Sequence, residues 1–142
     1  MKDSKSLFQI SKKAWDSGNH NIKILKAAFE SGRIYMESND VSKLSIEMLK
    51  WVSSKAIQMA NISRKNYVKV EFFQLYKKAL LLLAPHDFDS FCLYLEIDRE
   101  PQRRFYQPRR IVLGKVAKYF QKLADGELKL LALSMPPGTG KT

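Results

Sequence analysis

Residues 128–142 read LKLLALSMPPGTGKT, and this stretch decides the fold class of the chain. Residues 128–135 are nearly all apolar and lie between a turn at residues 125–126 and two prolines. The run is too short for a helix between such breakers. Its length and apolarity predict a buried strand of a parallel sheet. We therefore expect an α/β element here, followed directly by the glycine-rich turn at residues 138–140.

The residues after this strand match a phosphate-binding loop, which needs a strand, a glycine-rich turn, and then Lys and Ser or Thr. Gly138, Thr139 and Gly140 would bring their backbone N–H groups close to phosphate oxygens. The Lys141 ammonium would reach the β- and γ-phosphates as the catalytic cation, and the Thr142 hydroxyl would ligate a metal ion. The sequence therefore predicts ATP and Mg²⁺ as cofactors.

One position departs from the usual loop pattern, because Met135 stands where the first glycine is expected. Either the paired prolines supply the turn geometry, or a Gly/Pro-rich tail meets the pattern by accident. The sequence shows no second strand and no acidic residue for hydrolysis after Thr142. We therefore interpret the chain as a truncated N-terminal part of a larger P-loop NTPase, not expected to be active alone.

The preceding part of the chain is predicted to be helical. Apolar residues at helical spacing predict helices over residues 5–16, 20–31, 42–60, 67–83 and 88–95. Gly18 and Gly32 occupy positions typical of C-terminal caps, and Asp87 is expected to be an N-cap. The apolar stripes are expected to be core, and they consist of Leu44, Met48, Val52, Ala56 and Met59 in the third helix and Phe72, Leu75, Tyr76, Ala79, Leu80 and Leu83 in the fourth.

A change of character at Asp98 divides the chain into a helical region, residues 1–98, and the start of an ATPase domain, residues 99–142. Residues 99–122 hold eight basic residues and one acidic residue, so a polyanion is the expected partner unless these cations are only solvated. A basic helix is predicted over about residues 107–124, with Pro108 in its first turn. Its expected buried stripe consists of Val112, Val116, Tyr119, Phe120 and Leu123.

Composition fits a globular chain of about one domain: 142 residues, 45% hydrophobic, with a net charge of +11. The single cysteine, Cys92, cannot form an internal disulfide, which suits a reducing compartment. The longest apolar stretch, residues 79–85, is far too short to cross a bilayer, and no signal-peptide core is present. We therefore expect a cytoplasmic protein. His20 and His86 stand alone, without a metal-ligand array.

Residues 104–110 (RFYQPRR), the basic helix, and residues 131–142 together resemble large terminase subunits of tailed bacteriophages. The resemblance covers about residues 88–142. It implies an α/β ATPase domain of the RecA-like (ASCE) type, which drives double-stranded DNA into the prohead, and a C-terminal nuclease that is missing here. It also implies a location in the bacterial host cytoplasm, and as partners the portal protein, the small terminase subunit and further copies of the chain.

The resemblance also suggests roles for residues just before the basic helix. Gln107 would read the adenine edge, although it could equally cap the helix, and Tyr106 would stack on adenine unless it packs beside the helix start. Many terminases have arginine where this chain has Gly138. The remaining candidates for the catalytic arginine, or for DNA contact, are Arg103, Arg104, Arg109 and Arg110.

Two alternatives stay open. The motif is also used by superfamily 1 helicases and AAA+ proteins, although these usually keep glycine where Met135 stands. The other alternative is a non-catalytic helical module that binds nucleic acid or protein through its basic face. It predicts no dependence on nucleotide.

Overall fold

The computed structural model describes residues 3–38 and 41–129, and over this range the chain consists of helices joined by short turns. Six α-helices and two short 3₁₀ helices are present in the described residues. They are α1 (Ser4–Asp16), α2 (Ile22–Ser38), α3 (Lys43–Ile62), α4 (Asn66–Leu83), α5 (Phe88–Glu96), η1 (Pro101–Arg103), η2 (Gln107–Arg109) and α6 (Arg110–Ala124). The predicted helical character of this region is confirmed.

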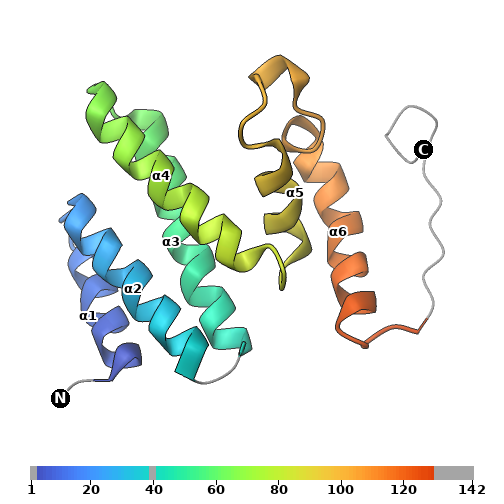
Figure 1. Cartoon of the computed structure of the whole chain (residues 1–142), viewed down its shortest axis with the longest axis horizontal. Helices are drawn as coiled ribbons and strands as arrows, with labels where there is room; N and C mark the ends of the chain where they lie inside the picture. Colours follow the sequence, from blue (N-terminus) through green and yellow to red (C-terminus); the bar gives the residue numbers. More distant parts are fainter. Residues whose placement is uncertain (1–2, 39–40, 130–142) are drawn as a thin grey trace.

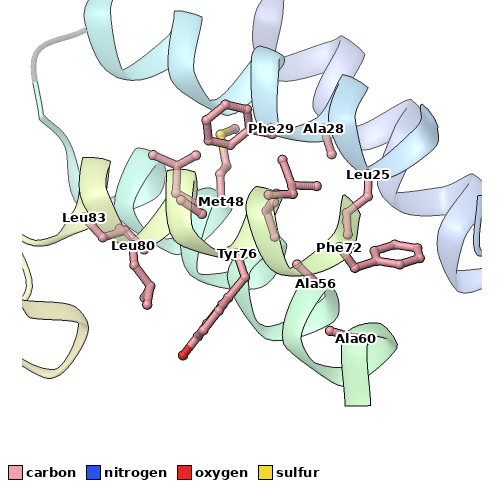
Figure 2. Packing of buried hydrophobic residues seen from close by; sticks show 14 of the residues in the cluster. Leu25, Ala28, Phe29, Met48, Ala56, Ala60, Phe72, Tyr76, Leu80 and Leu83 are labelled. Carbon is pink, nitrogen blue, oxygen red and sulfur yellow. The ribbon is translucent and has the colours of Figure 1, made fainter. Parts of the chain in front are cut away.

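Each helix packs against the next one along the chain, so α1 to α4 form a bundle from which α5 and α6 extend as a second pair (Figure 1). The bundle core lies between α2, α3 and α4, whose buried side chains face one another in Figure 2. All six residues of the predicted α4 stripe are buried. In α3, the middle of the predicted stripe is buried, and its ends, Leu44 and Met59, are half-buried. Both core predictions are therefore confirmed.

The helix ends explain where the chain turns. The side chains of Asp3, Ser42 and Asp87 accept hydrogen bonds from backbone N–H groups in the first turns of α1, α3 and α5. Gly18 ends α1 with a backbone φ of +107°, a value that favours glycine. The predicted caps at Gly18 and Asp87 are confirmed.

The prediction that Gly32 caps a helix was wrong, because α2 continues through it to Ser38. A Cβ atom at Gly32 would lie 3.2 Å from Leu49 Cδ2, so the missing side chain lets α2 approach α3 closely. At Gly32 the absence of a Cβ atom allows two helices to pack closely, whereas at a helix end it allows a positive φ. The sequence around the residue does not distinguish the two.

The buried stripe predicted for α6 was also wrong. Val112, Tyr119, Leu123 and Phe120 are 55%, 50%, 38% and 36% exposed, and Val116 is half-buried. The helix packs mainly through another face, on which Ala117 is buried, and of the predicted stripe Phe120 contacts Phe88 of α5 at a ring-centroid distance of 5.4 Å. On that face Gln121 Oε1 accepts a hydrogen bond from Phe88 N at 2.6 Å, and Gln121 Nε2 donates to His86 O at 3.1 Å. Polar anchoring to the α4–α5 turn therefore sets the rotation of α6 within the described part of the chain.

The predicted phosphate loop, with Gly138, Thr139, Gly140, Lys141 and Thr142, lies outside the described residues, as does most of the strand predicted over residues 128–135. The chain reaches this segment through Gly126, whose φ of +80° follows the last turn of α6. None of the described helices combines the length and apolarity that spanning a membrane requires.

Candidate phosphate-contact site at the start of α6

The connection from α5 to α6, which holds the predicted site residues of the described part, is organised by the buried carboxylate of Glu96. Its Oε1 accepts hydrogen bonds from Phe105 N and Tyr106 N, each at 2.7 Å. Its Oε2 accepts a third from Gln107 N at 3.2 Å. Burial alone would raise the pKa of Glu96, but these three hydrogen bonds outweigh burial and lower it. Glu96 therefore fixes the backbone of residues 105–107 as an anion.

A second carboxylate, that of Asp89 on α5, ties the start of α6 to the bundle. Arg110 donates two hydrogen bonds to this carboxylate, from Nε to Oδ1 at 3.0 Å and from NH2 to Oδ2 at 2.6 Å. The Tyr106 hydroxyl donates to Oδ1 of the same carboxylate at 2.5 Å. Burial opposes ionisation of Asp89, but the hydrogen bonds from Arg110 and Tyr106 and the charge of Arg110 lower its pKa. Such a two-point pair fixes the orientation of Arg110 and offsets its charge with that of Asp89.

The four predicted phosphate-contact arginines therefore differ in what they can reach. Arg104 turns inward, because it donates to the carbonyl oxygens of Arg99 and Ile97 at 3.1 and 3.2 Å. Arg110 is half exposed but already paired with Asp89. The Arg103 side chain is 78% exposed and lies 3.8 Å from a carboxylate oxygen of Glu100, also exposed. Arg103 is thus better placed than Arg104 to meet an external anion.

Arg109 presents its charge beside an aromatic ring. Its guanidinium carbon lies 4.4 Å from the centroid of the Phe105 ring, and its NH1 donates to Phe105 O at 3.0 Å. Both residues are exposed. A cation held on an aromatic face on the surface suits contact with a phosphate or a stacked base.

The two predicted adenine-contact residues lie in different surroundings. The Tyr106 ring is 7% exposed, which agrees with the interpretation that it packs beside the helix start, and stacking on adenine would require it to be uncovered. Gln107 is exposed, and its Oε1 accepts a hydrogen bond from Arg104 NH1 at 3.1 Å. Neither η2 nor α6 has a side-chain cap, so Gln107 does not cap the helix. Its adenine role stays a prediction.

A groove of about 920 Å³ lies between α3, α5 and α6 and is lined by Gln107 and Arg110. Lys43 and Lys50 line it from α3, and Lys118 and Lys122 from α6. Asp87 moderates this charge, since its carboxylate lies 2.9 Å from Lys50 Nζ. The groove thus gathers cations from two helices far apart in the sequence beside the predicted adenine-contact glutamine.

Sequence reasoning missed the two carboxylates that build this site. Neither Asp89 nor Glu96 was among the predicted site residues. A lone acidic residue at the end of the apolar run FCLYL was the available signal for Glu96. No three His, Cys, Asp or Glu side chains in residues 3–38 and 41–129 gather as a metal-binding group.

Comparisons of this chain with protein-family models, with curated proteins and with solved structures found no match.

Proposed function

We propose that this chain carries the N-terminal helices and the phosphate loop of an ATP-driven DNA-packaging motor of the large-terminase type. The observation that carries the proposal is the order of elements along the chain. The basic helix α6 ends at Ala124, and a short turn leads to the apolar run and the sequence Gly138-Thr139-Gly140-Lys141-Thr142. A strand followed by this glycine-rich sequence is the arrangement that phosphate binding needs.

In the proposed motor, Lys141 binds the β- and γ-phosphates of ATP and Thr142 binds Mg²⁺. The bound nucleotide supplies the free energy of phosphoanhydride hydrolysis, and the chain supplies positioning and charge. Gln107 contacts the adenine edge from its exposed position at the groove. Arg103 and Arg109, exposed on the α5–α6 connection, contact the phosphates of double-stranded DNA or of the nucleotide.

Nucleotide-dependent stabilisation tests the proposal on the protein made from its complete reading frame. At MgATP concentrations of about 100 times Kd, the folded state gains about 2.7 kcal/mol, so the melting temperature should rise by several degrees. Lys141→Ala should abolish this rise and ATP turnover. Lys129→Ala, at an exposed lysine near the start of the predicted strand, is the matched control and should retain both. A wild-type protein indifferent to MgATP, or an unchanged Lys141→Ala variant, would contradict the phosphate-loop assignment.

A second candidate, a non-catalytic helical module that binds nucleic acid, is favoured by one observation. The exposed Arg109–Phe105 pair offers a cation and an aromatic face together, as in nucleic-acid surfaces that need no nucleotide. In this case the chain binds DNA equally well with and without ATP. Replacing Arg103 and Arg109 together by alanine should lower the salt dependence of DNA binding by about two phosphate contacts.

A further inference from the structure

The five apolar residues Val112, Val116, Tyr119, Phe120 and Leu123 form one surface on α6, here called the apolar stripe. Four of its members follow one another at spacings of three or four residues, so they share a side of the helix. Val112 is 55% exposed and Tyr119 is 50% exposed, although such residues are normally covered. Because α6 is anchored through Ala117 and Gln121, most of the apolar stripe faces away from its packed side. Phe120 lies at the edge of the stripe and also contacts α5, since its ring centroid is 5.4 Å from that of Phe88. It is a surface prepared for a partner.

The backbone at the end of α6 reverses the chain toward this helix. Gly126 N donates to Leu123 O at 3.2 Å and Glu127 N donates to Lys122 O at 2.9 Å, which is the paired pattern of a Schellman turn. Leu128 N also donates to Lys122 O, at 3.2 Å. The chain therefore leaves the turn beside the last full turn of α6, with Leu128 already half-buried.

We propose that the apolar stripe is the docking surface for the chain's own residues 130–135. This segment lies outside the described residues, and its sequence, LLALSM, is predominantly apolar. α6 has 15 residues and is therefore about 22 Å long. Residues 130–135 in extended form reach about 20 Å, which matches that length. The turn at Gly126 tethers the segment at millimolar effective concentration, an advantage that no separate protein has.

The geometry also assigns a register. Val112 lies ten residues before Lys122, or about 15 Å along the helix axis. Four to five extended residues cover that distance, so a segment running back from Leu128 brings Leu133 about level with Val112. The proposal is independent of nucleotide binding, since it uses only the apolar stripe, the turn and the apolar segment.

Disulfide trapping in the full chain tests the docking. The single native cysteine is first removed by Cys92→Ser, and Val112→Cys is combined with Leu133→Cys. Mild oxidation should give an intramolecular cross-link in most chains, seen as faster migration on a non-reducing gel at monomer mass. The matched control combines Leu133→Cys with Ile111→Cys, because Ile111 is the neighbouring residue, is 88% exposed and points about 100° away. The control should cross-link at least tenfold more slowly.

Three results would overturn the proposal: equal cross-linking at positions 111 and 112, disulfides between chains, or none at all. Chain-to-chain disulfides would instead make the apolar stripe an interface between two copies. If the cysteine variants lose their helical circular dichroism, Leu131→Asp with Leu133→Asp replaces them. These charges should expel the segment and raise binding of a hydrophobic dye severalfold. Unchanged dye fluorescence would also refute the docking.

Discussion

Replacing Glu96 by glutamine tests how the start of α6 is built. The carboxylate accepts three backbone hydrogen bonds, two of them at 2.7 Å. A glutamine oxygen in the position of Oε1 keeps those two as neutral bonds, each weaker by about 1 kcal/mol than a charge-assisted one. Its NH₂ group then faces the N–H of Gln107, so the third bond is lost at a further cost of about 1 kcal/mol. The expected loss is therefore about 3 kcal/mol, local to this connection.

Residue-resolved amide hydrogen exchange at neutral pH measures this loss directly. A local destabilisation of about 3 kcal/mol corresponds to a roughly 100-fold drop in protection of the Phe105, Tyr106 and Gln107 amides. Amides of the bundle core, such as that of Val52, should keep their protection. Glu100→Gln is the control, because Glu100 is exposed and lies 3.8 Å from Arg103. Less than threefold change at all three amides in Glu96→Gln would refute the role given to Glu96.

Two further predictions follow from the described packing. Acidification below about pH 5 should loosen the α5–α6 connection. Folding lowers the pKa values of Glu96 and Asp89 from 4.5 and 3.8. The stabilisation from these carboxylates is therefore complete above those values and is lost as the pH falls through the folded-state pKa values. Tyrosine fluorescence that stays flat between pH 5 and 3 would contradict this. Gly32→Val should destabilise the bundle by about 1–3 kcal/mol in urea unfolding, because the added side chain would crowd Leu49. Gly114→Ala should stabilise α6 by up to about 1 kcal/mol, because a Cβ atom there would meet open space. Equal effects at the two glycines would contradict the packing argument.

The bundle was predictable because its signals are local and repeated. The apolar residues of α4 recur every three or four positions, and a helix that buries such a stripe has few other ways to fold. The rotation of α6 was not predictable, because its amphipathic pattern shows that one face needs cover without showing which element supplies it. Hydrogen bonds from Gln121 to backbone groups of the α4–α5 turn, more than 30 residues earlier in the chain, fix which face of α6 is packed.

At the start of α6, the residue types were visible in the sequence but their partners were not. Arginines are candidates for phosphate contact in any sequence, yet Arg104 donates hydrogen bonds to carbonyl oxygens of its own chain. The partners of Glu96 are backbone N–H groups, which every residue except proline possesses, so no residue type marks them. Only the folded path of residues 105–107 brings these three donors together.

This carboxylate also restricts how the start of α6 can bind an anion. Successive N–H groups at the beginning of a helix are a common phosphate site, but at residues 105–107 they are occupied by Glu96. A phosphate entering there would have to displace a buried carboxylate and leave its charge without partners, at a cost of several kcal/mol. An external phosphate at this connection would therefore have to be bound by side chains, and Arg103 and Arg109 are the exposed, unburied candidates among the four predicted arginines that are not held by Asp89 or by backbone carbonyls. In the motor that we propose, the backbone N–H groups that bind phosphate are therefore those of residues 138–141.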